Sequence, residues 1–559
     1  MTSIPDTSSS ESRHYNLAGL SQKDFWILCM SMWSCSFLSA FDGTIVATLL
    51  GPISSSFLAA NLASWLGTAY LLSVCCFTPI YGRLCNIIGR QAAMLIALGF
   101  FTLGNVMCAV APSMHFLVAA RAIAGIGGGG LTSVGSTIMS DLVPITHRGI
   151  FQGYANIAFG FGAGLGPPLG GLMSDGLGWR WAFFLQIPLL LLSAVLIYFK
   201  VRYTTNELST SDSVDPIVTA RRQTAREKLS RIDFLGCFLL AGFVGSSLFA
   251  VSLKTNSTSA DACKWSDPVI SGLFAASVVL FVIFVLVEAY YATEPVLPLE
   301  LLTQRTPISV AINNLSLVMM VYGTMYTVPL YLTTVRLMTA AEAGKHLIPN
   351  SFFGPTGSLL AGLLVRHTGR YYWFTALGGC FAVISSSLLS TWNTGTPEYM
   401  LWTNLCPQSL AAGSVTTFTI VGLIADIGRD HVAVATGLSY VFRTIGQVLG
   451  VSLSGALTQT ILQKELQRRI TGEGAGDIIA SIRKSSASIR LLPPDLQLSA
   501  VQSYQKAFHG VFSVSIVFAV VALLAGLGLK EVDLQGISGR QKVSEGPTGR
   551  AGASVGDEE

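Results

Sequence analysis

Runs of mostly apolar residues, each roughly 20 long, recur about fourteen times along this chain. A helix of about 20 residues spans the hydrocarbon core of a bilayer. Only 11% of the residues are charged, against roughly 25% in a soluble protein, so too little charge is available to cover a water-facing surface. The sequence therefore predicts an all-α polytopic membrane protein that a lipid bilayer surrounds.

The predicted transmembrane helices fall into three groups along the chain. A first set of six is expected near 26–48, 62–82, 92–111, 116–138, 150–172 and 181–201. Two further helices are expected near 234–253 and 268–289. A last set of six is expected near 308–332, 345–365, 372–391, 401–425, 432–460 and 508–529.

One short pattern occurs twice, each time between the second and third helix of a set of six. It is a glycine, six residues, and then Gly-Arg, and it runs from Gly82 to Arg90 and from Gly362 to Arg370. The first copy includes Gly82, Arg83, Asn86, Gly89 and Arg90. A turn repeated at matching places in two halves indicates a transporter built by duplication. We therefore predict two six-helix bundles with two inserted helices, 14 transmembrane helices in all.

The charges predict an orientation. Lys and Arg are frequent in 200–231 and in both repeated turns, and positive loops stay in the cytosol. An even number of helices then places both termini in the cytosol. The connection 463–506 is also basic although it falls outside by parity, and the repeat is given the greater weight. The expected divisions are a Ser-rich disordered tail (1–24), the N-terminal bundle (25–202), a cytosolic linker (203–232), the inserted helices (233–305), the C-terminal bundle (306–530, with a long non-cytosolic loop at 463–506) and a cytosolic tail (531–559).

Several classes of function are not indicated. The ten cysteines show no metal-binding spacing, no catalytic triad or phosphate-binding loop occurs, and a net charge of +4 provides no basic stripe for nucleic acid. Gly125 to Gly130 matches a dinucleotide motif only formally, since it lies inside an apolar run, and close helix packing explains it better. We expect no enzyme, cofactor, metal or nucleic-acid partner, and a monomer. Asn256 begins a possible glycosylation sequon in a non-cytosolic loop.

Asp42 and Arg121 are the charged residues placed deepest in the first and fourth predicted helices. A carboxylate at the bilayer centre costs roughly 2.5–3.5 kcal/mol, so it faces a cavity or a partner and is a candidate proton site. Arginine keeps its charge and must find a counter-charge, which Asp42 could supply if the two helices pack together. The alternatives are a structural hydrogen bond for Asp42 and snorkelling of Arg121 to the interface.

The fifth predicted helix carries Gly162, Gly166 and Gly170 at a spacing of four, together with Pro167 and Gly171. One face is therefore bare backbone, and the proline removes an amide donor and bends the helix. Such a helix suits rocking contacts between bundles, and plain tight packing is a compatible interpretation. Polar residues in spans are candidates for a substrate cavity, although each could instead bond a neighbouring helix: Asn156, Asn313, Asn314, Tyr326, Arg443 and Gln447.

These motifs together resemble the major facilitator superfamily. Gly82 to Arg90 resembles its loop motif, Arg121 to Gly125 its fourth-helix motif, and Gly162 to Gly171 its fifth-helix antiporter motif. Phe41 to Val46 and the predicted helix count are similar to the fungal 14-helix drug:proton antiporter family. Asn86 stands where the loop motif has an acid, so the full strength of that gate is not expected here.

Within that family, Gln152 to Gly160 and Trp179 to Pro188 are most similar to vacuolar basic amino acid transporters. The resemblance implies a proton antiporter in the vacuolar membrane whose partners are protons and a small-molecule substrate, and the substrate would be basic or other amino acids. One alternative is a plasma-membrane efflux pump for drugs or toxins. Another is a nutrient sensor that does not transport.

Overall fold

The computed structural model describes residues 21–143, 145–200, 233–256, 267–291, 299–427, 432–471, 474–484 and 486–531. These residues form helices joined by short connections and contain no strand. The first half contains α2 (Gln22–Ser56), η1 (Ala60–Leu62), α3 (Ala63–Ile88), α4 (Arg90–Ala109), α5 (Met114–Leu142), α6 (Ile145–Gly176), α7 (Trp181–Phe184) and α8 (Gln186–Lys200). The inserted pair is α11 (Phe234–Asn256) and α12 (Pro268–Tyr290). The second half contains α13 (Leu299–Leu302), α14 (Arg305–Thr334), α15 (Ala340–Lys345), α16 (Ile348–Thr368), α17 (Tyr372–Ser390), α18 (Glu398–Thr403), α19 (Cys406–Ile427), α20 (Val432–Arg469), α21 (Ala475–Lys484), η4 (Ser486–Leu491) and α22 (Pro494–Gly526).

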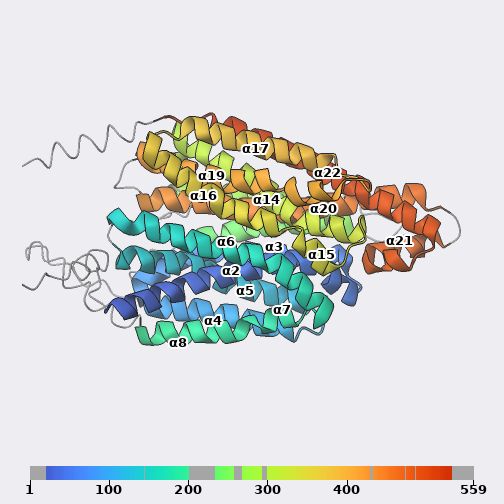
Figure 1. Cartoon of the computed structure of the whole chain (residues 1–559), viewed down its shortest axis with the longest axis horizontal. Helices are drawn as coiled ribbons and strands as arrows, with labels where there is room; N and C mark the ends of the chain where they lie inside the picture. Colours follow the sequence, from blue (N-terminus) through green and yellow to red (C-terminus); the bar gives the residue numbers. More distant parts are fainter. Residues whose placement is uncertain are drawn as a thin grey trace, which may run out of the picture.

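The helices pack as two bundles that lie side by side along the long axis of the molecule (Figure 1). In the N-terminal bundle α2 packs on α6, and α5 packs on α3 and α4. In the C-terminal bundle α14 packs on α20 and α22, and α16 packs on α19. The predicted architecture of two helical bundles is confirmed.

The repeated glycines end the second long helix of each bundle. Gly89 follows α3 with φ of +89°, and Gly369 follows α16 with φ of +68°. Side chains with a Cβ rarely adopt positive φ, so glycine suits both positions. The two halves therefore turn at matching residues, as the sequence repeat predicts.

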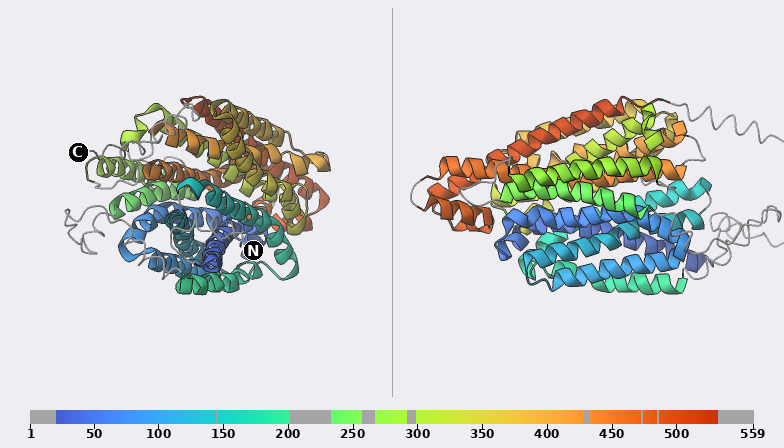
Figure 2. Two further views of the ribbon diagram at one scale, coloured as in Figure 1. Left: turned by 60° about the vertical axis from the view of Figure 1, so that its left-hand side comes forward. Right: turned by 180° about the vertical axis from the view of Figure 1, so that it is seen from behind.

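The two ends of the molecule differ. α2 begins and α22 finishes at one end, which we call the termini end, while α15 and α21 lie at the other, the α21 end (Figures 1 and 2). The inserted helices α11 and α12 pair with each other, and α11 contacts both α3 and α20 (Figure 2). The inserted pair therefore covers one of the seams between the bundles.

Eleven helices among the described residues are long and apolar enough to cross a membrane. The other three predicted spans are helices as well, but α6 and α16 are not among the eleven, and α11 is a shorter apolar helix at Leu235–Val251. All fourteen predicted spans are thus helical, but only eleven of them, within the described residues, are long and apolar enough to count as membrane spans. Glycines and polar residues lower the mean hydropathy of α6 and α16. Several of these glycines lie where the two helices pack closely on other helices.

Residues 463–506, which we expect to form a long connection of helical character, are largely helical where the structure describes them. α20 continues to Arg469, and α22 begins at Pro494, with α21 and η4 between them. Leu462, Leu466, Ile482 and Phe508 belong to one buried apolar cluster that holds this region together. Hydropathy windows miss such helices because their apolar residues occupy one face only.

Candidate functional site

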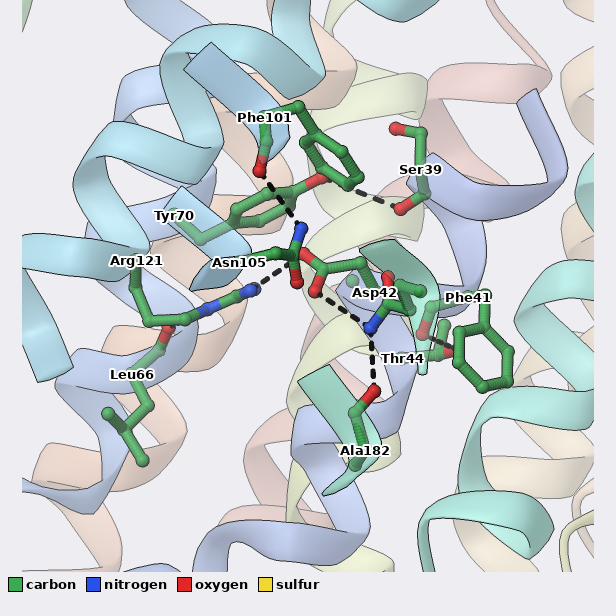
Figure 3. A network of polar contacts seen from close by, with 12 residues as sticks. Ser39, Phe41, Asp42, Thr44, Leu66, Tyr70, Phe101, Asn105, Arg121 and Ala182 are labelled. Carbon is green, nitrogen blue, oxygen red and sulfur yellow. Dashed lines mark hydrogen bonds and ion pairs between the residues drawn. The ribbon is translucent and has the colours of Figure 1, made fainter. Parts of the chain in front are cut away.

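A buried ion pair lies inside the N-terminal bundle (Figure 3). Arg121 Nη1 of α5 donates to Asp42 Oδ2 of α2 at 2.6 Å, and neither side chain is exposed. The predicted partnership of Asp42 and Arg121 is therefore present in the structure. Arg121 and Gln186, whose side chains donate to this carboxylate, both belong to its own bundle.

Three further groups surround the pair. Gln186 Nε2 lies 3.4 Å from Asp42 Oδ1 and also donates to the Ala182 carbonyl at 2.9 Å. The Tyr70 ring lies 4.3 Å from the Arg121 guanidinium carbon, within cation–π distance. Arg121 Nε donates to the Leu66 carbonyl at 3.3 Å. Sequence reasoning gave no role to Gln186 or Tyr70, although a polar residue inside an apolar run was a usable signal for both.

Glycines on α5 let this helix pack closely on α3, the helix that carries Tyr70. A Cβ at Gly125 would overlap the Tyr70 carbonyl, and one at Gly128 would lie 2.6 Å from the Tyr70 hydroxyl. A Cβ at Gly130 would lie 2.9 Å from the Tyr81 ring. These contacts support close helix packing as the role of Gly125 to Gly130.

The glycines of α6 pack on α2. A Cβ at Gly166 would overlap the Thr44 hydroxyl, and one at Gly170 would lie 2.6 Å from Ile45 Cγ1. The Gly162 position is equally tight against the carbonyl of Phe37. This stripe therefore seats α6 against a helix of its own bundle.

Another face of the same helix meets the C-terminal bundle. The Asp175 carboxylate accepts from the Ala341 amide of α15 at 2.9 Å. A Cβ at Gly171 would overlap the Ala340 carbonyl, and one at Gly344 would lie 2.5 Å from the Pro167 carbonyl. We call this contact between the end of α6 and α15 the clasp.

Additional hydrogen bonds link the bundles. Tyr326 of α14 donates to the Gly43 carbonyl of α2 at 3.0 Å. The Thr68 and Ser452 hydroxyls are 2.8 Å apart, and Ser351 donates to the Gly164 carbonyl at 3.2 Å. The residues that make these bonds lie nearer the α21 end of their helices. On α2, α6 and α14, which run toward that end, they lie in the second half of the helix. On α3 and α16, which run away from it, they lie in the first half. The bundles are thus joined toward the α21 end.

Two hollows differ in character. A cavity of about 50 Å³ lies between the bundles and is lined by residues that include Ser64, Tyr326 and Gln459. A hollow of about 560 Å³ lies between α2 and α6 and is lined mainly by apolar residues such as Trp33 and Tyr154. Phe161, Leu165 and Leu172 are exposed along the same side of α6, so this larger hollow continues an exposed apolar surface.

The predicted cavity residues are distributed over different contacts. Asn313 donates to the Ala522 carbonyl at 2.6 Å, and Asn314 donates to Ser439 at 2.9 Å, so both amides bond neighbouring helices of their own bundle. Gln447 donates to the Tyr322 hydroxyl at 3.1 Å. The guanidinium carbon of Arg443 lies 5.3 Å from the Tyr440 ring. Tyr326 takes part in the contact between the bundles.

The remaining predicted residues lie in or near helix ends. Arg90 Nε donates to Asp141 Oδ2 at 2.9 Å, which ties the first turn of α4 to the end of α5. Gly82 lies in α3, where a Cβ would lie 3.6 Å from Ser133. The side chains of Arg83, Asn86, Asn156 and Asn256 lie outside the described residues.

Two bundles of membrane-spanning length, with a charged pair buried inside one of them, are typical of membrane transporters. A profile of the Major Facilitator Superfamily matches residues 32–451, and the chain belongs to that superfamily. It is therefore a transporter and not an enzyme.

Similar proteins come from yeasts. The chain is 37% identical to the multidrug resistance protein fnx1 of Schizosaccharomyces pombe, over 90% of this chain and 92% of that one. It is 32% identical to the vacuolar membrane amino acid uptake transporter fnx2 of the same yeast, over 85% and 79% of the two chains. It is 30% identical to vacuolar basic amino acid transporter 1 of Saccharomyces cerevisiae, over 92% and 93%.

A solved structure supports the fold. The bacterial homologue of the human lysosomal transporter Spinster, in an inward-facing and unoccupied conformation, aligns with a TM-score of 0.58 over 91% of this chain and 98% of that one. Its sequence identity is 13%, so the likeness bears on the fold alone.

Proposed function

We propose that this protein is a proton-coupled antiporter of the vacuolar membrane that exports small organic solutes, chiefly basic amino acids, from the cytosol. The observation that carries the proton coupling is the Asp42–Arg121 ion pair. It is fully buried, and the single carboxylate balances the single guanidinium. Transporters for amino acids of the vacuole among the similar proteins support the substrate and the membrane.

The termini end is the cytosolic end in this proposal. The basic residues of the repeated turns support this orientation, since positive loops stay in the cytosol. The bundles are joined toward the α21 end, so the described conformation is the one open to the cytosol. Substrate would enter between the bundles from that side.

Asp42 is the proton carrier in the proposed cycle. Its carboxyl is not exposed in this conformation, so proton exchange requires the α21 end to open. Protonation removes the negative charge that Arg121 binds, which weakens the pair and changes how α2 and α5 pack. One pH unit of gradient supplies about 1.36 kcal/mol, and 100 mV adds about 2.3 kcal/mol per charge moved.

Asp42→Asn tests the coupling. The amide nearly matches the carboxylate in shape but cannot exchange a proton, so we expect pH-driven uptake of labelled lysine into proteoliposomes to fall to background. Asp426→Asn is the matched control, because Asp426 lies at the end of α19, 3.9 Å from Lys530, and its variant should retain uptake. Uptake by the Asp42 variant at the rate of the control would remove Asp42 from the mechanism.

A second candidate is an efflux pump of the plasma membrane. The identity of 37% to a multidrug resistance protein favours it. A fluorescent fusion to the full chain distinguishes the two candidates. Fluorescence at the vacuolar rim supports the vacuolar exporter, whereas fluorescence at the cell periphery together with drug resistance supports the pump.

A further inference from the structure

Two arginines lie about two turns or more inside spanning helices, and only one of them has an acidic partner among the described residues. Arg121 pairs with Asp42. Arg443 of α20 makes no ion pair within the part of the chain that the structure describes. Apart from Asp42, the carboxyl groups of the described spanning helices lie within about two turns of a helix end, as do Asp141, Asp175, Glu288 and Asp426. Arg443 is therefore a mid-span charge without a counter-charge.

Arg443 shares a helix face with a residue that is already fixed by a hydrogen bond. Gln447 follows Arg443 by four residues, so the two side chains lie on one face of α20. Gln447 Nε2 donates to the Tyr322 hydroxyl of α14 at 3.1 Å. Donors of three kinds, guanidinium, amide and phenol, are thus gathered at one place.

That place faces the N-terminal bundle. Thr444, next to Arg443, contacts Cys75 of α3 at 3.4 Å. Tyr326, one turn after Tyr322 on α14, reaches the Gly43 carbonyl of α2. Arg443, Gln447 and Tyr322 are partly exposed, and along the helix axes they lie about 6 Å toward the termini end from that contact. The group therefore lies beside the contact between α20 and α3, on the termini side of the Tyr326 contact.

The chemistry of this group favours an anionic ligand. A guanidinium retains its charge and presents a planar pair of N–H donors that matches a carboxylate. A charge at membrane depth is costly until it finds a counter-charge, and a bound carboxylate would supply one. No described mid-span carboxylate is available as a counter-charge for Arg443, because Asp42 already pairs with Arg121.

We propose that Arg443, with Gln447 and Tyr322 beside it, binds the carboxylate of the transported solute. This inference rests on the proposed function and narrows it, because it requires that the solute carry a carboxylate. Solutes that are purely cationic meet an unpaired positive charge here and bind poorly. The site thereby distinguishes an amino acid from the amine that remains when its carboxylate is removed.

The test compares L-lysine, lysine methyl ester and cadaverine as probes for the purified full-length protein. The readout is the ligand-induced rise in unfolding temperature in detergent, which needs no proton gradient. We expect the wild-type protein to bind lysine roughly 10- to 100-fold more tightly than the ester or cadaverine, the ratio that a charge-assisted hydrogen-bond pair provides. Arg443→Met should lose that ratio, and Arg443→Lys should keep part of it.

Arg468→Met is the matched control. Arg468 lies on the same helix, is exposed and makes no ion pair within the described residues, so its loss should leave the preference for lysine unchanged. If Arg443→Met does not fold, Gln447→Leu and Arg443→Lys provide the comparison, and each should reduce the preference.

Each result has one meaning. The carboxylate site is overturned if Arg443→Met still prefers lysine over its ester. If Arg443→Met does not fold, the site is overturned when Gln447→Leu and Arg443→Lys both keep the wild-type ratio. Either result leaves the proposed function in place. A wild-type protein that lysine, arginine and histidine all fail to stabilise overturns the proposed substrate, and the carboxylate site with it.

Discussion

Asp42 and Arg121 place opposite charges 2.6 Å apart where neither side chain is exposed. Moving two charges out of water costs several kcal/mol each, and their attraction offsets that cost only while both are present. The second terminal nitrogen of Arg121, Nη2, has no hydrogen-bond partner among the described residues, so the arginine depends on Asp42 in particular. A proton that neutralises Asp42 therefore acts on the whole pair.

A double-mutant cycle measures this dependence. Asp42→Asn and Arg121→Met should each lower the free energy of unfolding by about 3–5 kcal/mol, because each leaves a buried polar group or charge without its partner. The double variant should lose less than the sum of the two, since no buried charge remains. Unfolding temperatures in detergent provide the measurement, and strictly additive losses would show that the two side chains act independently.

At the scale of the helix, α6 uses its glycines in two directions. Gly162, Gly166 and Gly170 let it approach α2 within the bundle, whereas Gly171 faces α15 in the other bundle. The sequence motif from Gly162 to Gly171 contains the glycines that face α2 and the glycine that faces α15, and the sequence alone does not show which face each glycine occupies. One helix thus joins a contact within its own bundle to a contact between the bundles, and the proposed cycle requires the second contact to open.

Two alanine variants on α6 distinguish the loss of a close contact from the effect of replacing any glycine of this helix. The Cβ of Gly166→Ala would overlap the Thr44 hydroxyl, and we expect a loss of about 1–3 kcal/mol. Gly176→Ala, in the same helix, meets nothing within 4 Å and should change stability by less than about 0.5 kcal/mol. Thermal unfolding of both variants is the measurement, and equal losses would contradict the assigned contact.

The short helix α15 depends on a capping box. The Thr339 amide donates to the Glu342 carboxylate at 2.9 Å, and the Glu342 amide donates to the Thr339 hydroxyl at 3.2 Å. The Thr339 amide holds the pKa of Glu342 below its ordinary value. A depressed pKa means that this cap stabilises α15 above the ordinary carboxyl range of about pH 4 and is lost as the pH falls through the lowered value.

Acid should therefore loosen α15. We expect amide hydrogen exchange in Ala340–Lys345, compared at equal intrinsic rates, to rise as the pH falls below about 4. Glu342→Gln retains the hydrogen bonds of a capping box without a titrating group, so its exchange should change less with pH. An equally steep pH response in that variant would assign the effect to other groups, among which Asp175 and Glu398 lie nearest to α15 and His346.

At the scale of the whole molecule, the clasp joins α6 to α15 at the α21 end, and the proposed cycle uses it to close that end. Gly171→Leu would place a side chain where the Ala340 carbonyl lies, so the clasp should not close. We expect faster hydrogen exchange of the α15 amides and a loss of transport, because one of the two openings can no longer be sealed. Gly176→Leu serves as the control, since its position is open, and unchanged exchange in Gly171→Leu would show that the clasp tolerates bulk.

Sequence reasoning reached the fold and part of the site. Apolar length and the repeated Gly-Arg turn predicted the bundles, and a lone acid and a lone arginine inside spans predicted their partnership. It could not tell that Asn313 and Asn314 bond helices of their own bundle, because hydropathy does not record which way a polar side chain points. The role of Gln186 was missed for the same reason, since it depends on tertiary contacts.

The inserted helix α11 touches α3 on one bundle and α20 on the other. The opposite seam, where α6 meets α16, has no third helix across it among the described residues. The two flanks are therefore held in different ways: α11 lies against both bundles on one, whereas the other is joined by direct contacts such as the clasp and the Ser351–Gly164 hydrogen bond. Because direct contacts can separate while α11 stays attached to both bundles, we expect the bundles to move apart more at the α6–α16 seam than at the α3–α20 seam.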